Sequence, residues 1–491
     1  MKNDYNSYLQ TIKEFGEVEQ VKHPLIYLSG LPNARPMETI VFETGEVGHI
    51  LSLNEDTIEA TTFSRQSVKI GTKAARTNTF FQVPVGNNVL GKIVDPTGQL
   101  RSSTQSWSAD EYRDVEGGRA LLQERSKITK PLFTGVSIID LMLPLGSGQR
   151  QMIVGDRQTG KTSILLSILT TQARLGSIIV YASIGKEQSE ISRISQYCQN
   201  AGVLKQTVIV ASSASDSPSL VDMTPYTAMT IAEYFKDQGK DVVLILDDLT
   251  THARYYRELA LLGKRFPGRD SYPGDIFYKH ARLLERAGNF VQGKKNVAIT
   301  CLPVSETIEE SLTDYITSNL IGITDGHFLF SQEAFNRGRR PAIDLFYSVT
   351  RVGRQTQQTA IRELNHQLMR LLSDYEKALK FAHFGAELIE ETKQLLHTGS
   401  LTHAFFEQRT GVDVPQAVQT IAVGLILLKA FDDLNPDDIA SIRQSLTEAY
   451  QQDKAFQKQA TELLTAATSD EFLTQLDANK ESILKICKPK N

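Results

Sequence analysis

Apolar and polar residues alternate differently in three successive parts of the chain. From about residue 15 to residue 95, short β-rich runs are separated by glycine and proline, with the clearest runs at residues 47–53, 57–63 and 89–95. Short strands at regular spacing with turn residues between them are typical of a small β-barrel. We therefore expect an N-terminal barrel domain over residues 1–95.

The pattern changes over residues 96–371, where apolar β-branched runs alternate with helical stretches. These runs lie at residues 152–154, 177–182, 207–211, 242–246 and 297–301. Nearly continuous apolar strands between helices indicate a parallel sheet that is covered on both faces. The middle of the chain is therefore predicted to be an α/β domain.

No β-rich run follows residue 371. Residues 375–396 and 439–467 carry apolar residues at helical spacing among many Glu, Gln and Lys residues. The predicted fold class is thus multidomain α/β: a small barrel, a parallel-sheet domain and a C-terminal helical domain over residues 372–491.

Composition excludes several classes of function. The chain has 491 residues, 41% hydrophobic and 22% charged, with a net charge of −4. This charge leaves no electrostatic footprint for nucleic acid, and no apolar run approaches the roughly 20 residues that span a bilayer. The polar first ten residues do not resemble a signal peptide. We therefore expect a cytoplasmic protein that makes any membrane contact through partners.

One motif carries the strongest chemical signal. The stretch matches GxxxxGK[ST], follows an apolar strand and opens a helix, and it comprises Gly155, Asp156, Arg157, Gln158, Thr159, Gly160, Lys161 and Thr162. Such a phosphate loop turns backbone N–H groups toward phosphate oxygens at a helix N-terminus. Lys161 is expected to reach the β- and γ-phosphates of ATP or ADP, and the Thr162 hydroxyl to ligate Mg²⁺.

A second motif agrees with the first. Residues 242–246 form an apolar run that ends in Asp247 and Asp248. A buried strand that ends in Asp is the Walker B pattern of phosphate-loop proteins, in which the carboxylate holds magnesium. Asp247 is therefore the second predicted magnesium ligand, through a water molecule.

These motifs lie in surroundings that resemble the alpha subunit of F-type ATP synthases. The similar stretches are GDRQTGKT at 155–162, DDL at 247–249, FPGRDSYPGD at 266–275, LLERA at 283–287, ITDG at 323–326, RPAI at 340–343 and SVTRVG at 348–353. The resemblance covers about residues 14–430. It implies a RecA-like nucleotide domain and a ring of three alpha and three beta subunits around a gamma-type central stalk.

The resemblance makes residue 186 informative. Catalytic beta subunits have Glu at the matching position, where it positions the attacking water, and alpha subunits have Gln, whereas this chain has Lys186. A charged Lys accepts no proton from water, and Glu187 is one residue away on the chain. We therefore expect a chain that is largely non-catalytic on its own. Lys186 could pair with the γ-phosphate or weaken magnesium binding by repulsion, and the sequence does not decide between them.

The resemblance also implies residues for a neighbouring subunit and for the base. Arg351 matches the arginine finger that reaches the beta subunit's catalytic site, and Ser348 is expected to position its loop. Gly322 stands where the family commonly has Ser. Arg340, Pro341 and Gln408 match positions near the adenine. Since about a dozen residues precede Phe15, attachment to the outer-stalk subunits is expected to be shorter or different.

Three alternatives remain open at the level of sequence. A homohexameric flagellar or secretion-type export ATPase would share the barrel and phosphate loop, but it would need its own catalytic Glu. A ring helicase resembling the terminator Rho would need an RNA-binding surface, which the near-neutral charge opposes. A specialised motor or sodium-pumping complex remains possible, because the membrane sector selects the transported ion. Neither the ion nor the physiological direction follows from this chain.

Overall fold

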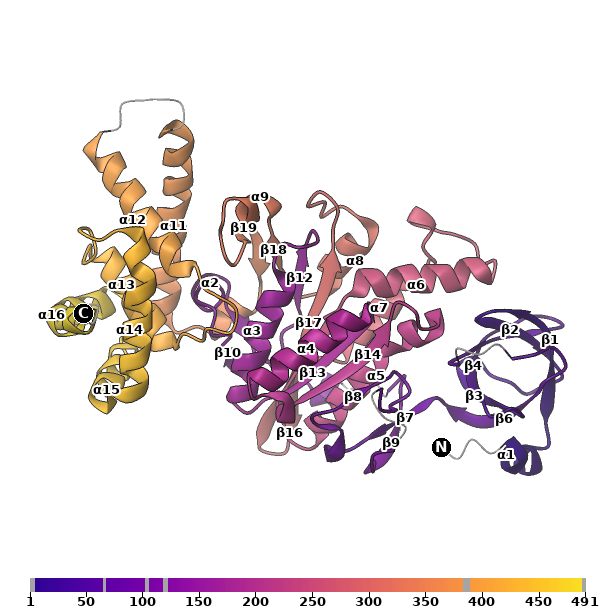
Figure 1. The fold of residues 1–491 in the computed structure, drawn as a ribbon. Helices are drawn as coiled ribbons and strands as arrows, with labels where there is room; N and C mark the ends of the chain where they lie inside the picture. Colours follow the sequence, from indigo (N-terminus) through magenta and orange to yellow (C-terminus); the bar gives the residue numbers. More distant parts are fainter. Residues whose placement is uncertain (1–4, 65–67, 102–105, 118–121, 383–388, 488–491) are drawn as a thin grey trace. The chain divides into compact units, whose positions relative to one another are not determined.

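The computed structural model describes residues 5–64, 68–101, 106–117, 122–382 and 389–487 (Figure 1). The chain forms two compact units. The first unit comprises residues 1–127, 152–154 and 173–324, and the second comprises residues 128–151, 155–172 and 325–491. Neither unit is one continuous piece of sequence.

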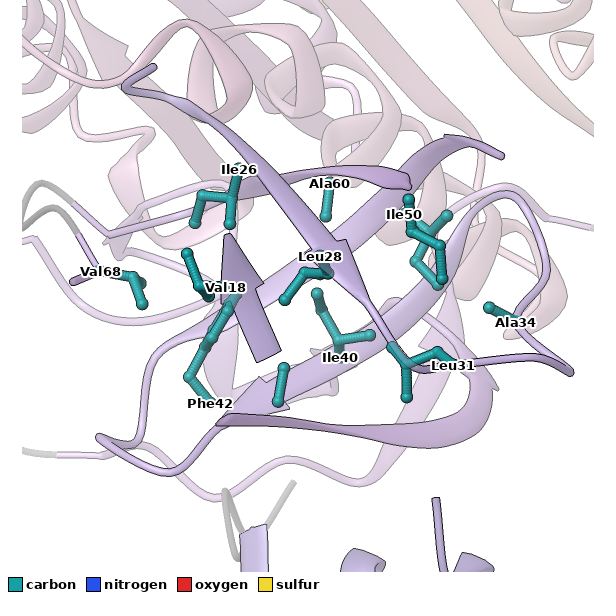
Figure 2. Packing of buried hydrophobic residues seen from close by; sticks show 12 residues of the cluster. Val18, Ile26, Leu28, Leu31, Ala34, Ile40, Phe42, Ile50, Ala60 and Val68 are labelled. Atoms are coloured by element: carbon teal, nitrogen blue, oxygen red, sulfur yellow. The ribbon is translucent and has the colours of Figure 1, made fainter. Parts of the chain in front are cut away.

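The first unit begins with a closed antiparallel barrel. Its elements are α1 (Tyr5–Ile12), β1 (Phe15–Lys22), β2 (Leu25–Ser29), β3 (Glu38–Phe42), β4 (Val47–Leu53), β5 (Ile58–Thr62) and β6 (Lys73–Phe80). The strands close in the order β1-β2-β5-β4-β3-β6. Buried side chains such as Ile26, Leu28, Ile40 and Phe42 fill the interior (Figure 2). A barrel this small is stable because its interior is just wide enough for side chains to fill.

The first unit also holds the strands of a largely parallel sheet. They are β8 (Ile93–Val94), β12 (Gln151–Gly155), β13 (Ile178–Lys186), β14 (Thr207–Ser213), β15 (Val242–Asp247), β16 (Gly288–Gln292) and β17 (Lys295–Glu306). Their order is β12-β17-β15-β13-β14-β8, with β16 antiparallel to β17. Every residue of β14 and β15 is buried, as expected for strands covered on both faces.

Helices follow these strands along the chain. They are α4 (Gln188–Asn200), α5 (Pro218–Asp237), α6 (Leu249–Leu262), α7 (Ile276–Glu285) and α8 (Tyr315–Ile323). A two-stranded antiparallel sheet pairs β7 (Gln82–Val85) with β9 (Glu111–Asp114). Short 3-10 helices lie at Asn87–Val89, Leu122–Glu124, Leu204–Gln206, Arg269–Ser271 and Pro436–Asp438. The strand–helix alternation places the carboxyl ends of β13 and β15 next to each other.

The second unit contains the phosphate-loop helix and the C-terminal helices. Its elements are β10 (Pro131–Leu132), α2 (Ser137–Met142), β11 (Leu145–Gly146), α3 (Lys161–Arg174, whose last two residues belong to the first unit), β18 (Gly326–Phe330), α9 (Gln332–Asn336), β19 (Ile343–Thr350), α10 (Gly353–Thr356), α11 (Thr359–Ala382), α12 (Glu390–Phe406), α13 (Gln416–Leu427), α14 (Ile439–Gln452), α15 (Lys454–Leu463) and α16 (Ser469–Cys487). Strands β18 and β19 pair antiparallel.

Polar contacts tie the C-terminal helices to α2. Asn365 of α11 donates to the carbonyl oxygens of Leu141 and Met142, at 2.6 and 3.0 Å. Gln419 of α13 donates to the buried Asp140 carboxylate at 3.0 Å. Because buried polar groups are costly unless they are paired, these bonds specify how the helices dock on α2.

The three-part architecture predicted from sequence is confirmed, although two element assignments differ. The barrel closes with β6, whereas β8 pairs with β14, so that Ile93 lies opposite Ile209 and Val94 opposite Val210. Of the β-rich run predicted over residues 89–95, only Ile93 and Val94 form a strand, and the local sequence does not reveal which sheet that strand joins, because strand pairing is a long-range contact.

The helical part of the chain begins before residue 372, since α11 starts at Thr359. The helical stretch predicted over residues 375–396 covers the end of α11 and the beginning of α12, and residues 383–388 lie outside the described residues. The stretch at 439–467 is divided by Asp453, whose carboxylate caps α15 by accepting from the N–H groups of Ala455 and Phe456. Within the described residues, no helix has the length and apolar character that crossing a membrane requires.

Candidate nucleotide-binding site

The predicted phosphate loop connects β12 directly to α3. Gly155 ends the strand against Phe330, and a Cβ atom on residue 155 would lie 2.6 Å from the Phe330 carbonyl oxygen. Gly160 has a φ of +96°, in the left-handed region that glycine adopts without strain. Both glycines are therefore required by the local backbone.

The loop is held by its own side chains. The ammonium nitrogen of Lys161 donates to the carbonyl oxygens of Gly155 and Asp156, at 2.8 and 2.6 Å. The Thr159 hydroxyl also donates to the Asp156 carbonyl, at 2.8 Å. Arg157 and Gln158 are exposed at the tip of the loop. This arrangement holds a cation and the N-terminus of α3 in place, which together form a ready anion site.

A second group of charged residues lies at the carboxyl ends of β13 and β15. The two strands are parallel neighbours, with Ser183 opposite Asp247. The Lys186 ammonium lies 3.1 Å from Asp247 Oδ1 and 2.8 Å from Asp248 Oδ2. The side chain of Asp248 is fully buried, while those of Asp247 and Lys186 are 7% and 16% exposed. The predicted position of Asp247 at a strand end is therefore correct, but a lysine already pairs with it.

Further contacts fix both carboxylates. The Tyr181 hydroxyl donates to Asp247 Oδ2 at 2.6 Å. Asp248 caps α6, because its Oδ1 accepts from the Thr251 N–H at 2.6 Å and its Oδ2 accepts from the Thr251 hydroxyl at 3.0 Å. Asp247 thus has a partner on each oxygen, and Asp248 is committed to the helix terminus.

The pKa shifts follow from these contacts. Burial acts to lower the pKa of Lys186, but the charges of Asp247 and Asp248 outweigh it and raise that pKa above its usual value. Burial acts to raise the pKa of Asp248, while the charge and hydrogen bond of Lys186 bring it below its usual value. These shifts favour the ammonium form of Lys186 and the ionised form of the buried Asp248 carboxylate.

Glu187 begins the turn after β13. It is exposed and precedes α4, and its carboxylate lies 3.4 Å from the Ser189 hydroxyl. The carboxylate that follows Lys186 in sequence is thus exposed at the surface, whereas the Asp247 side chain is 7% exposed.

Arg351 follows β19 at the surface of the second unit. Its backbone N–H donates to the Asp325 carbonyl at 3.1 Å, and Asp325 is held in turn by the Arg150 guanidinium at 2.8 Å. Among the residues that the structure describes, no carboxylate forms an ion pair with the exposed Arg351 side chain. Ser348 Oγ accepts from the Leu329 N–H at 2.9 Å, which joins β19 to β18 just before Arg351.

Two of the three residues predicted near the adenine, Arg340 and Pro341, line a cavity of about 290 Å³ in the second unit. Its lining includes Arg340, Pro341, Ile138 and Phe406. The Arg340 guanidinium lies over the Phe335 ring, 3.5 Å from its centroid, and donates to the Phe335 carbonyl at 2.8 Å. Phe335 does not line the cavity, but the aromatic residues Phe346, Tyr347 and Phe406 do, and aromatic rings are groups on which a planar base can stack.

Gln408 does not line this cavity, and its amide is occupied. The side-chain carbonyl accepts from the Ser137 N–H at 3.0 Å, and the amide nitrogen donates to the carbonyl oxygens of Gly135 and Val412 at 2.6 Å. Its backbone N–H donates to the Arg340 carbonyl at 2.7 Å. A contact between the Gln408 side chain and a base would require these bonds to break, so that role stays a prediction.

Two family models match this chain. Residues 135–350 match the nucleotide-binding domain of the ATP synthase alpha/beta family, and residues 357–484 match the C-terminal domain of the ATP synthase alpha/beta chain. The chain belongs to the ATP synthase alpha/beta family.

Similar proteins place it on the alpha side of that family. ATP synthase subunit alpha of Mycoplasma pneumoniae is 37% identical over 482 residues, which cover 96% of this chain and 93% of that protein. The same subunit of Mycoplasma genitalium is 37% identical over 92% of this chain and 88% of its own length, and that of Neorickettsia sennetsu is 36% identical over 88% and 87%. These similarities favour an alpha-type nucleotide-binding subunit of an ATP synthase over the export ATPase alternative.

Sequence reasoning missed several residues of this ATP synthase family member. Tyr181 and Asp248 complete the surroundings of Lys186, and Phe335 supplies the ring beneath Arg340. The repeated Asp at 247 and 248 was a usable signal for a second acceptor. Tyr181 could not be identified, because it lies among the apolar residues of β13 and its role depends on the pairing with β15.

Proposed function

We propose that this chain is the regulatory, largely non-catalytic nucleotide-binding subunit of an ion-transporting two-sector ATP synthase. The observation that carries the proposal is the Lys186 ammonium within 3.1 Å of Asp247 and 2.8 Å of Asp248. Hydrolysis requires a group that positions and deprotonates water, and an ammonium paired with two carboxylates does neither. The phosphate loop supports binding of ATP or ADP, which the family shares.

In this proposal the catalytic site belongs to a beta-type partner. The chain would alternate with three such partners in a ring around a gamma-type stalk, with outer-stalk subunits attached by a contact that this chain does not specify. Arg351 would reach the partner's site as an arginine finger, since its guanidinium is exposed and a guanidinium can bridge two phosphate oxygens. Ser348 would hold the strand from which Arg351 extends.

The assembly would lie at the cytoplasmic face of the cell membrane and reach the bilayer only through other subunits. The transported ion, H⁺ or Na⁺, would be selected in the membrane sector. In this family, ATP synthesis or hydrolysis is coupled to ion flow. This chain would then take part in that process as a subunit of the complex, without catalysing the reaction itself.

Co-purification and turnover test the proposal together. A tagged full-length chain should recover a beta-type partner in equal amount, and the purified chain alone should bind ATP with turnover below about a few per cent of the complex. Recovery of a single-chain hexamer with full ATPase activity would contradict it, because each chain would then carry its own catalytic group.

A further inference from the structure

Three charged side chains from two neighbouring strands meet in a nearly closed space. Lys186 comes from the end of β13, and Asp247 and Asp248 from the end of β15. Two carboxylates carry two negative charges, and the ammonium neutralises one of them. The cluster lies within the first unit.

The two carboxylates differ in how readily each could bind an additional cation. Asp248 is fully buried and is committed to the N-terminus of α6 through Thr251. Asp247 is the predicted magnesium ligand, but the Lys186 ammonium pairs with Oδ1 and the Tyr181 hydroxyl donates to Oδ2. A divalent cation at Asp247 would therefore lie beside a lysine charge in a poorly hydrated environment, where repulsion between cations is strong.

The ion pair itself is difficult to displace. Removing one partner of a buried pair leaves an uncompensated charge, and Lys186 has two carboxylates to hold it. Magnesium dehydrates reluctantly and prefers carboxylates that are free to accept from its water shell. The residues around Asp247 therefore fit a resident ammonium better than a hydrated dication.

We propose that Lys186 is a tethered cation that takes the place of the divalent metal at Asp247, so that this chain binds ATP or ADP largely independently of magnesium. This inference rests on the proposed nucleotide binding and specifies its cofactor requirement. It assigns Lys186 a positioning role: it neutralises Asp247 and keeps the carboxylate pair in one arrangement, whether or not a metal accompanies the nucleotide.

The test is ATP binding to the purified full-length chain, measured by calorimetry with excess MgCl₂ and again with EDTA. We expect the dissociation constant of the parent chain to differ by less than about threefold between the two buffers. For Lys186→Gln, we expect the dissociation constant in MgCl₂ to be at least about tenfold lower than in EDTA. Lys240→Gln, which removes an exposed lysine, is the matched control and should behave as the parent does.

Lys186→Arg keeps the positive charge and should keep the insensitivity to magnesium. It also serves as the second variant where Lys186→Gln does not fold, as judged by circular dichroism. A parent chain whose affinity rises tenfold or more with magnesium overturns the inference, whichever variants fold. Absence of ATP binding in both buffers is a different result, because it contradicts the proposed function itself.

Discussion

The ammonium nitrogen of Lys161 lies 2.8 Å from the carbonyl oxygen of Gly155 and 2.6 Å from that of Asp156. The lysine thus bridges the two ends of the loop that is predicted to surround the phosphates. Phosphate oxygens would replace these carbonyl acceptors with stronger, charge-assisted partners.

Lys161→Ala should therefore abolish tight nucleotide binding. We expect the affinity of the isolated chain for ATP to fall by about 10- to 150-fold from this contact alone, since a charge-assisted contact contributes roughly 1.5–3 kcal/mol, and to fall further because its loss disturbs the loop. Calorimetric titration would measure this, with Lys240→Ala as the control. Unchanged affinity in a folded variant would show that the nucleotide binds elsewhere.

Arg351→Ala should separate binding from catalysis. Because the side chain is exposed and lies outside the phosphate loop, ATP affinity of this chain and assembly with the beta-type partner should be nearly unchanged. The ATPase rate of the reconstituted ring should fall by about two orders of magnitude, since a finger acts on charge that develops in the transition state.

Arg351→Lys should restore little of that rate, because an ammonium cannot bridge two oxygens. Arg193→Ala removes another exposed arginine and is the control. If the Arg351→Ala ring assembles and keeps more than about a tenth of the parent rate, Arg351 is an interface residue without a part in the chemistry.

His49 predicts a pH dependence of barrel stability. Burial lowers its pKa from the usual 6.5 to about 4, its ring stacks on Phe63, and its Nδ1 has no hydrogen-bond partner among the described residues. Between these two pH values the unfolded chain binds a proton that the folded barrel does not. Stability is therefore lost as the pH falls through this window, by about 3 kcal/mol in full.

His49→Phe keeps the ring and removes the titration, so its barrel should gain about 2–3 kcal/mol relative to the parent between pH 7 and about pH 4.5. Urea unfolding at both pH values would measure this difference. Hydrogen exchange of peptides from the barrel, with labelling at one common pH, would report the unfolding of the barrel itself. His366→Phe, at an exposed position, is the control. Equal acid sensitivity of parent and His49→Phe would mean that another group titrates.

Two helical glycines should respond to alanine with opposite signs. A Cβ atom on Gly399 of α12 would lie 2.2 Å from the Tyr375 ring of α11, whereas one on Gly322 of α8 would meet no atom within 4 Å. We expect Gly399→Ala to destabilise the chain by about 2 kcal/mol or more through overpacking. Gly322→Ala should stabilise it by about 0.5–1 kcal/mol through helix propensity. Thermal unfolding of the two variants side by side would measure both, and a stabilised Gly399→Ala would show that the helices can separate without cost.

The strand, loop and helix around residues 155–162 could be predicted because their information is local: the glycine spacing, the preceding strand and the following helix all lie within about 20 residues. The surroundings of Lys186 could not, because they depend on the register that places Ser183 opposite Asp247, more than sixty positions along the chain. Gln408 illustrates a different limit. Its position matches the family, yet its amide nitrogen donates hydrogen bonds to the backbone carbonyl oxygens of Gly135 and Val412. Such bonds can be identified only in the folded chain.

The division of the chain into alternating segments has a consequence for synthesis on the ribosome. Residues 155–172, which carry the phosphate loop and most of α3, belong with residues 325–491, and the Gly411 N–H donates to the Ser167 hydroxyl across that interval. The loop therefore emerges long before the residues that support it. Until those residues are made, the growing chain has a complete barrel but an unfinished anion site, so premature termination should yield a product that folds in part and captures no nucleotide.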